Sequence, residues 1–592
     1  MTRTALDRTA DVVVVGSGLG AVAAALAAAR AGRTVLLAAA RTRLGGQATT
    51  QLVPALDEHP HIETGGASTS YAAFRAAIRA QYDGVDNPGG GWVSRLCCEP
   101  AAAEKALETL LAPHITAGRL TVLRQLAPVA VRKDGDRVTG IDFRAPGDER
   151  VTTLTGEVFC DATEAGDLLP MAGAPWVCGS EGRDAYGESL ALPGPAQPGA
   201  VQSCTVGFVV EKAPPGETGP VGDAPPGYAR WREAQPFTLE IAGWDGRAHR
   251  YRMFEDGPDG HPPFWTYRRL REGAVLGGRD AALINWAGND YADTSALDDP
   301  ARAYTEAKRL SEAFLHWLRT ECPRDDGGLG HPELRLVPEV SGTPDGYAEE
   351  PYLRESRRLR TARPVRQQDL EPVPGRARAA GFADSGGLAM YHMDLHSRVG
   401  HPQSAYAPTA PFQIPLSALV APAPVNLLAA AKNLGATQVA ASAYRVHQGE
   451  WAVGEAAGAL AAQACLRSLT PARVVADRRE LTWLQAALAG SGVPLAWTLD
   501  VGPGHPHFVA VQLLGAAGAL TGPRAAQLTA DPDAPVTEPA LASLREAAAR
   551  LLGDPGPVPV PTPDPTGTTW VEAAAALWSA VARALPTRAE NQ

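Results

Sequence analysis

The sequence predicts an α/β protein in three parts: a discontinuous domain with a buried parallel sheet, an inserted α+β domain and a helical C-terminal region. Three observations support this organisation. Residues 11–40 run through a strand pattern, a glycine turn, a helix pattern and a second strand pattern. Residues 173–424 are dense in proline, glycine and aromatic residues and contain short alternating runs, which are typical of antiparallel strands. Residues 471–592 contain helix patterns joined by proline-rich links.

The stretch 11–40 has the sequence DVVVVGSGLGAVAAALAAARAGRTVLLAAA. Its four consecutive valines predict a strand buried on both faces, and residues 21–30 form a strong helix pattern that ends at Gly32. Residues 34–38 then predict a second strand. The turn at 16–21 has no bulky side chain, so a pyrophosphate can approach its backbone and the N-terminus of the helix. This unit predicts dinucleotide binding.

The uncharged run from Val12 to Ala29 is also long enough for a membrane span or for the core of a signal peptide. Asp7 and Asp11 stand where a signal peptide has basic residues, and three glycines interrupt the run. We therefore favour a buried domain segment.

One residue expected in a dinucleotide site is missing. The acid that holds the ribose hydroxyls normally lies about 20 residues past the glycines, at the end of the second strand. Residues 37–43, LAAARTR, contain no acid. Either the ribose is held by the backbone and other side chains, or Arg41 and Arg43 face a phosphate, as in NADP sites.

Composition restricts the class of protein. A chain of 592 residues with 45% hydrophobic and 20% charged residues is typical of a globular protein of two to four domains. The net charge of −11 argues against nucleic acid or an anionic membrane as partner. The seven cysteines are scattered and form no CxxC pair, which excludes a zinc knuckle or a redox-active CxxC disulfide and favours a reducing cytoplasm.

The remaining elements follow in chain order. The motif LGGQAT at 44–49 predicts a loop that passes close to a ligand on the first helix. Residues 51–95 are an excursion from the first domain. The predicted elements after it are a helix at 100–111, strands at 120–123, 129–133, 138–143 and 158–163, a strand at 425–431 and an alanine-rich helix that opens at Gly454. The first domain therefore comprises 1–172 and 425–470.

The inserted substrate or cap domain, 173–424, contains an amphipathic helix at 301–320. We expect ion pairs at a domain interface from Arg354, Glu355, Arg357 and Arg358. A turn or a substrate contact is expected from Asn285, Trp286, Asn289 and Asp290. The C-terminal region, 471–592, is predicted to hold a helix–loop–helix module at 505–552, a proline-rich linker at 554–566 and a last helix at 570–585.

Taken in order, these motifs resemble those of the FAD-dependent oxidoreductases of the glutathione-reductase-like fold. The matching pieces are GSGLGA at 16–21, LGGQAT at 44–49, CEP at 98–100, DATEAGDLLPMAGA at 161–174, INWAGNDY at 284–291, YLRESRRL at 352–359, NLLAAAKNLGAT at 426–437, SAYRVHQGEW at 442–451 and VGEAAGALAA at 453–462. The resemblance implies a Rossmann-like FAD-binding domain and FAD as the cofactor. Residues 505–552 resemble a degenerate S-layer-homology repeat.

The resemblance also implies which residues contact FAD. They are Gly16, Gly18, Gly20 and Ala21 under the pyrophosphate, Arg41, Gly45, Gly46, Gln47, Val129 beside the adenine, Ala162, Thr163, Asp167 and Asn433, with Gly454, Glu455 and Ala456 on the helix that points at the isoalloxazine. The family's common DATG reads DATE here, with Glu164 in place of the glycine. The family's ribose-binding Glu falls at Ala39, so we expect FAD to be held less tightly than usual.

Catalytic residues are expected on the loops that face the flavin. Tyr444, Arg445 and His447 precede the flavin-facing helix; Arg445 can bind a substrate carboxylate, and His447 can act as a base or hold the flavin's pyrimidine edge. His392 lies in YHMDLH, where polar residues at alternate positions share one face of a strand. A metal site there lacks further ligands, so we expect none.

The sequence contains no second GxGxxG motif in a strand context. Electrons then enter from the substrate and leave to O2 or another acceptor, which predicts a cytoplasmic flavoprotein that oxidises a small organic metabolite by hydride transfer to flavin N5. Two alternatives remain: a flavin monooxygenase that uses NAD(P)H and O2, and a non-catalytic interaction protein that binds the nucleotide.

Overall fold

A seven-stranded mixed sheet contains the predicted valine strand. The structure is a computed structural model and describes residues 7–585 except 215, 219, 236, 243–246 and 554–566. The strands in order across the sheet are β3 (Leu120–Leu123), β2 (Val35–Ala38), β1 (Arg8–Val15), β6 (Val151–Asp161), β5 (Arg137–Arg144) and β4 (Ala127–Asp134), and β22 (Leu427–Ala429) also pairs with β6.

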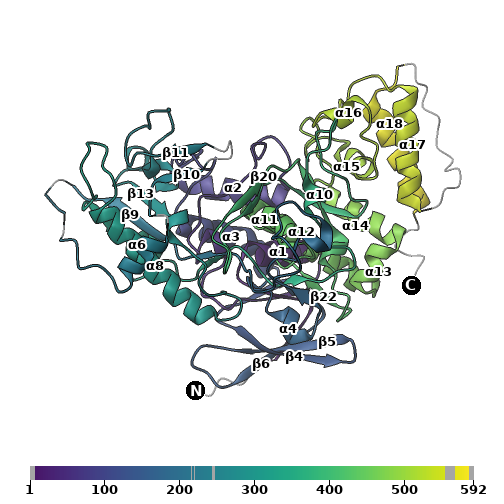
Figure 1. Ribbon diagram of the computed structural model, residues 1–592. Coiled ribbons are helices and arrows are strands. Elements are labelled where there is room, and N and C mark those ends of the chain that lie inside the picture. The colour runs from purple at the N-terminus through teal and green to yellow at the C-terminus, as the bar shows by residue number, and fades with distance from the viewer. Residues whose placement is uncertain are drawn as a thin grey trace.

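The valine strand is central, as its composition requires. Val12 lies opposite Val35 of β2 and Val158 of β6, and both pairings are parallel. The four valines are at most 1% exposed, which confirms the predicted strand with two buried faces. The predicted strands at 120–123, 129–133 and 138–143 correspond to β3, β4 and β5. β4 and β5 form an antiparallel hairpin at the bottom of Figure 1.

Two helices distant in sequence pack along each other at the centre of the molecule (Figure 1). They are α1 (Leu19–Arg30) and α12 (His447–Arg467). A Cβ atom at Gly454 would lie 2.1 Å from Gly20 O, so only glycine permits this approach. The other helices of the first domain are α2 (Thr69–Arg79), α3 (Pro100–Thr116), α4 (Leu168–Ala172) and α11 (Gln438–Tyr444).

The predicted start of the alanine-rich helix of the first domain was wrong. α12 begins at His447 and not at Gly454, because Val446 is the extended residue that precedes it. The glycine belongs to the packing surface of the helix two turns further on. The helix N-terminus, where backbone N–H groups are unpaired, therefore lies beside residues 447–450.

A second hydrophobic core belongs to the cap, which we define as residues 204–353 and which lies at the left of Figure 1. The amphipathic helix α8 (Pro300–Thr320) buries Leu310, Phe314 and Trp317 in this core, as its pattern predicted. The strands of the cap form the sheets β12 (Arg269–Arg271)–β13 (Ala281–Ile284)–β9 (Phe208–Lys212)–β15 (Leu334–Leu336), β14 (Asp290–Tyr291)–β8 (Cys204–Thr205)–β16 (Tyr352–Leu353) and β10 (Glu240–Ala242)–β11 (Ala248–Arg250). Its other helices are α6 (Tyr228–Ala234), α7 (Gly273–Leu276) and α9 (Pro338–Ser341).

Some residues between the cap and the predicted boundary at 424 pack in the hydrophobic core of the first domain. Val365, Leu388 and Ile414 are buried, and Val365 and Ile414 belong to the same hydrophobic core as α1 and α12. The elements that flank the cap are β7 (Trp176–Val177), α5 (Arg183–Tyr186), β17 (Arg358–Leu359), α10 (Gln367–Leu370), β18 (Ser385–Ala389), β19 (Met393–Leu395), β20 (Ala405–Ala407) and β21 (Phe412–Pro415).

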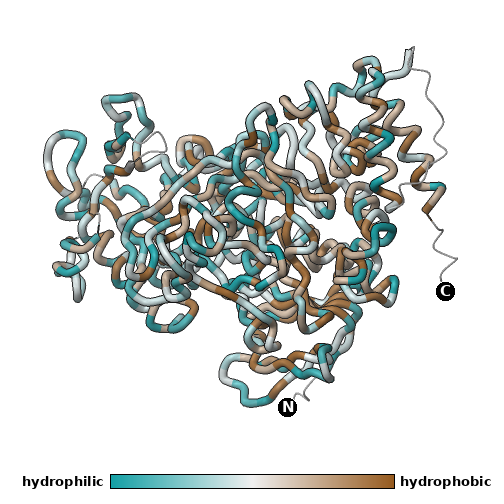
Figure 2. The backbone as a smooth tube through the Cα atoms, turned by 45° about the vertical axis from the view of Figure 1, so that its right-hand side comes forward, coloured by the Kyte–Doolittle hydropathy of each residue, from teal (hydrophilic) through white to brown (hydrophobic). Residues whose placement is uncertain are grey.

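The C-terminal region consists of helices at the upper right of Figure 1. They are α13 (Pro471–Ala476), α14 (Arg478–Gly490), α15 (Phe508–Ala516), α16 (Pro523–Ala526), α17 (Glu538–Leu552) and α18 (Trp570–Ala584). Their apolar faces are continuous with the core of the first domain. Figure 2 shows hydrophobic and hydrophilic segments alternating along these helices, as expected for one buried face. The predicted linker at 554–566 lies outside the described residues.

None of the helices in the described ranges combines the length and the apolar composition that a membrane crossing needs.

Candidate active site

Three segments meet at the N-terminus of α1, as the sequence predicted. The Gly45 N–H donates to Ser17 O at 2.7 Å, which holds the LGGQ loop against the glycine turn. The Ala162 N–H donates to Val15 O at 2.8 Å, which brings the loop after β6 to the same place. Backbone atoms with small side chains therefore surround the first turn of α1.

Two carboxylates lie against this turn. A Cβ atom at Gly18 would lie 2.5 Å from Glu164 Oε1 and 2.7 Å from Glu450 Oε1, so both side chains cover the glycine. Glu450 Oε1 accepts the Gly20 N–H at 3.1 Å, and Glu450 Oε2 accepts Nε2 of Gln47 at 2.5 Å. An anion thus already occupies the N-terminus of α1, where the helix dipole favours negative charge.

A buried lysine balances part of this charge. Nζ of Lys432 forms an ion pair with Glu164, and the lysine side chain is 2% exposed. Burial and, to a smaller extent, Glu164 raise the pKa of Glu450 to about 7, although Lys432 opposes the rise. Burial would lower the pKa of Lys432, but Glu164 and Glu450 raise it above its usual value. Glu450 is therefore easy to protonate mainly because it is buried, and one nearby lysine does not offset burial and the second carboxylate.

The loop after β6 is held by hydrogen bonds within the protein. Asp161 Oδ1 accepts the backbone N–H and the hydroxyl of Thr163 at 3.0 and 2.7 Å, and Asn433 Nδ2 donates to Asp161 O at 3.0 Å. Burial raises the pKa of Asp161 to about 7. Asp167 forms an ion pair with Arg357 at 3.1 Å. Thr163 and Asn433 therefore position this loop, whereas Asp167 contacts an arginine.

The two arginines at the predicted nucleotide end of the site both form ion pairs. Arg41 pairs with Glu350 at 2.6 Å, and Arg43 pairs with Glu104 at 3.0 Å. Both guanidiniums thus bind acids of the protein. Ala39 is fully buried, and Val129 is 40% exposed on β4.

The predicted cofactor residues on α12 are packed against neighbouring elements. Gly454 lies against α1, and Ala456 is fully buried. Glu455 Oε1 accepts the Ser70 hydroxyl at 2.6 Å, which ties α12 to α2. The residue of α12 that reaches the glycine turn is Glu450, one helical turn before Gly454.

A second polar cluster joins the cap to the first domain. His396 Nδ1 lies 2.6 Å from Asp290 Oδ2, and its Nε2 lies 3.1 Å from Asp394 Oδ2. Arg354 pairs with Asp290 at 2.9 Å, and Arg445 pairs with Asp394 at 3.0 Å. We call these five residues the seam network. Asp290 comes from the cap and Arg354 follows its last strand directly, whereas Arg445 ends α11 of the first domain.

The seam network holds a cationic histidine. Burial and Arg354 lower the pKa of His396, but Asp394 and Asp290 outweigh them, and its pKa is raised. Burial raises the pKa of Asp290, but Arg354 and His396 reverse this and lower it to about 2. With His396 protonated between these two carboxylates, the network contains three cations and two anions and carries a net positive charge.

The other predicted catalytic residues have partners within the protein. The Asp57 N–H donates to His447 Nδ1 at 3.0 Å, and His447 Nε2 lies 2.7 Å from Val53 O. Burial lowers the pKa of His447 to about 4. The Tyr444 hydroxyl donates to Gln413 O at 2.8 Å within the core. His447 and Tyr444 therefore hydrogen-bond to the backbone of other segments of the chain.

His392 directly precedes β19, and Asp394 of the seam network acts electrostatically on it. Its ring packs against Tyr391 and Tyr406, with centroids 5.6 and 4.9 Å away. Burial lowers the pKa of His392. Of the predicted catalytic residues, the structure thus brings only Arg445 into the seam network.

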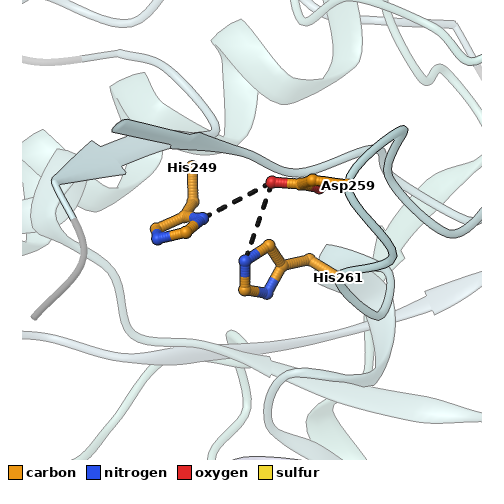
Figure 3. A group of neighbouring side chains, drawn as sticks. All are labelled: His249, Asp259 and His261. Atoms are coloured by element: carbon orange, nitrogen blue, oxygen red, sulfur yellow. Dashed lines mark hydrogen bonds and ion pairs between the residues drawn. The ribbon is translucent and has the colours of Figure 1, made fainter. Parts of the chain in front are cut away.

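A group of possible metal ligands lies elsewhere, in the cap. Asp259 Oδ2 is 3.5 Å from His249 Nδ1 and 3.7 Å from His261 Nε2, and Figure 3 shows both imidazoles turned toward this carboxylate. The sequence analysis expected no metal site and did not single out these residues.

Sequence reasoning also missed Glu450 and the pairing of Asp290 with His396. A signal for Glu450 was available, because it is one of only two acids in an alanine- and glycine-rich helix pattern and lies in its first turn. The Asp290–His396 pair joins residues that are 106 positions apart, and no local pattern encodes it.

Comparisons with known proteins support the resemblance. The model of the family described as FAD dependent oxidoreductase matches residues 11–488. No curated protein matches. A myxobacterial chondrochloren halogenase, described as a variant of FAD-dependent halogenases, is 17% identical, with 35% of this chain and 45% of that chain covered and a TM-score of 0.23.

A geranylgeranyl bacteriochlorophyll reductase-like protein from Thermoplasma acidophilum is 12% identical, with 56% and 65% covered and a TM-score of 0.24. The chain thus spans less than two thirds of either solved structure, and neither likeness identifies an activity. The family match, in contrast, extends over most of the chain. The protein therefore belongs to the FAD dependent oxidoreductase family, and it is an enzyme of the kind whose cofactor is FAD.

Proposed function

We propose that this enzyme oxidises a small organic anion, with FAD as the electron acceptor and the cap as the substrate domain. The observation that supports the proposal is the seam network, which places Arg445 and the cationic His396 between the cap and the first domain. Buried cations at a domain interface favour the binding of a carboxylate or a similar group.

The seam network is suited to binding rather than to proton abstraction. Both nitrogens of His396 lie within hydrogen-bond distance of carboxylates, so the imidazolium is held and has no free nitrogen to act as a base. Arg445 uses Nη1 for the Tyr352 hydroxyl at 2.7 Å and Nη2 for Asp394. Among the described side chains, its buried Nε has no hydrogen-bond partner. Arg445 therefore retains a donor for a substrate anion.

The backbone around α1 fits FAD, but two side chains do not. The glycine turn, the LGGQ loop and the loop after β6 form the frame that a pyrophosphate needs. Glu164 and Glu450 lie in that frame, over Gly18, and Glu450 takes the Gly20 N–H. A pyrophosphate and these carboxylates would be like charges at one place, so they would repel each other there.

The test is reduction of the FAD-loaded enzyme without oxygen. Small carboxylic and amino acids are mixed with the enzyme, and loss of the flavin absorbance band is followed. Bleaching by one of them supports the proposal. Bleaching by NADH or NADPH alone would instead indicate the monooxygenase alternative. The variants R445M and R445K separate the charge of Arg445 from the geometry of its guanidinium.

A further inference from the structure

We propose that Glu164 and Glu450 act as an internal occupant of the FAD pyrophosphate position, so that FAD binds weakly and reversibly, and only when these side chains are displaced. The inference rests on the proposed use of FAD by this enzyme. It predicts that the protein is isolated largely without flavin, which distinguishes it from an enzyme with a permanently bound cofactor.

The contacts of Glu450 are those that a phosphate would make. Its Oε1 accepts a backbone N–H from the first turn of α1, at Gly20, and it lies over Gly18, the residue whose missing side chain opens the turn. Helix N-termini bind phosphates and carboxylates through the same N–H groups. The carboxylate therefore competes directly with a pyrophosphate.

Glu164 blocks the same place from the opposite loop. Its Oε1 would lie 2.6 Å from a Cβ atom at Gly46 and 2.5 Å from one at Gly18, so it fills the space between the glycine turn and the LGGQ loop. This position is a glycine in the family's DATG pattern. The side chain is therefore an addition to the frame.

The two carboxylates differ in how easily they can leave. The Glu450 residue is 1% exposed, on a helix that packs along α1, whereas the Glu164 side chain is 16% exposed, on a loop. Displacing Glu164 also separates it from Lys432, which would then be free to pair with a phosphate. We expect Glu450 to be the stronger obstacle.

At the nucleotide end of the site, few protein groups are available to strengthen FAD binding. Ala39 replaces the acid that holds the ribose, and Arg41 and Arg43 already bind Glu350 and Glu104. Weak ribose contacts and an occupied pyrophosphate position both act to lower the affinity for FAD.

The test measures FAD affinity by isothermal titration calorimetry and by quenching of flavin fluorescence. The variants are E164G, which restores the DATG pattern, E450A, which removes charge and volume, and E450Q, which removes charge alone. The matched control is E480Q, because Glu480 is a buried acid of α14 that pairs with Arg467 of α12 at 2.7 Å. Circular dichroism checks that each variant is folded.

We expect E164G and E450A each to bind FAD about tenfold more tightly than the wild type, and the double variant more tightly still. E480Q should bind FAD as the wild type does. The inference is overturned if wild-type protein retains stoichiometric FAD, or if neither folded variant gains affinity. Failure of the proposed function is a separate result: the double variant would bind FAD, but no substrate would reduce it.

A different observation carries a second inference. The geometry points to a site for a divalent transition-metal ion, Zn²⁺ as the first choice, formed by His249, Asp259 and His261. One possible ligand atom from each residue lies within 4.8 Å of the others. Two imidazoles and a carboxylate are a donor set that Zn²⁺ prefers, and ligand atoms around tetrahedral zinc lie about 3.3 Å apart.

The backbone supports this arrangement. His249 lies on β11, while Asp259 and His261 come from a turn closed by the Gly257 N–H, which donates to His261 O at 2.8 Å. The Asp259 side chain is 45% exposed, so an ion can enter from solvent and keep a water ligand. Figure 3 shows the three side chains converging from these two segments.

Calorimetry with ZnCl₂ on chelator-treated protein tests this site. The wild type should bind one equivalent of Zn²⁺, and H261A and D259N should each lose at least about tenfold in affinity. The control is H505A, because His505 and His507 are also neighbouring rings, with centroids 5.8 Å apart, in the C-terminal region. Unchanged zinc binding by folded H261A and D259N, or no binding by the wild type, would overturn the inference.

Discussion

Gly454 of α12 lies directly on the backbone of Gly20 of α1, with 2.1 Å between Gly20 O and the place where a Cβ atom would stand. The pair sits beside the N-terminus of α1, where Glu450 accepts the Gly20 N–H. The spacing of these two helices therefore sets the position of the carboxylate that covers the glycine turn.

The first prediction concerns this helix contact. G454A should destabilise the protein by about 2 kcal/mol or more, because the added methyl group forces α12 away from α1. Urea unfolding followed by circular dichroism measures the loss. G490A is the control, since no atom lies within 4 Å of a Cβ at Gly490 and the residue ends α14. Equal stability of G454A and the wild type would contradict the packing described.

The second prediction concerns pH. The pKa of Glu450 is raised to about 7 in the folded protein, so its ionisation opposes folding. The amount by which Glu450 lowers the free energy of unfolding is zero below the pKa of the unfolded state, near pH 4.5, and grows as the pH rises through 7. E450Q should therefore stabilise the protein relative to wild type at pH 8 more than at pH 5, by up to about 3 kcal/mol.

That comparison isolates Glu450 from its neighbours. Glu164 and Lys432 face the same carboxylate and remain in both proteins, so the difference between wild type and E450Q removes most of their own titration. If the stability difference were the same at pH 5 and pH 8, the raised pKa would be wrong.

The third prediction concerns the seam network. The pKa of His396 is raised, so its pairing stabilises the protein below pH 6.5 and this contribution is lost as the pH rises through the folded value. D290N should lower the pKa of His396 by about one unit or more, because it removes one of the two carboxylates that hold the imidazolium. NMR titration of the imidazole measures the change, and H396Q identifies the His396 signal among those of the 13 histidines.

The fourth prediction concerns substrate binding. R445M should lower kcat/KM for the anionic substrate about 30-fold or more, mainly through KM, because it removes a charged hydrogen-bond donor. R445K should recover only part of the loss, since an ammonium cannot reproduce the contacts to Tyr352 and Asp394 together. A neutral substrate that is oxidised equally well by wild type and R445M would argue against anion recognition.

The sequence predicted the elements that depend on interactions between residues close together in the chain. The valine strand, the glycine turn and the strand at 35–38 depend on neighbours along the chain, and the structure confirms them. The ion pairs of Arg354 and Arg358 were also predicted, because arginines and acids in one short motif need partners. The start of α12 was missed because Gly454 is a packing residue, and a glycine marks a helix end equally often.

The candidate site is formed by contacts between residues that are far apart in the sequence. Glu450 reaches a turn 430 residues earlier, and His396 bonds an aspartate of the cap. Neither contact leaves a periodic pattern, since each is set by how the first domain folds around α12. The family resemblance located the loops correctly but not the carboxylates between them.

The C-terminal helices share their apolar core with α1 and α12, and this has a practical consequence for anyone who shortens the chain. A protein cut after residue 470 would leave the outer face of the first domain without its cover, since Leu484, Val511 and Leu577 belong to that same core. Loss of activity after deletion of residues 471–592 would then indicate misfolding. A role of this region in recognition or anchoring has to be tested with point substitutions at its solvent-exposed positions.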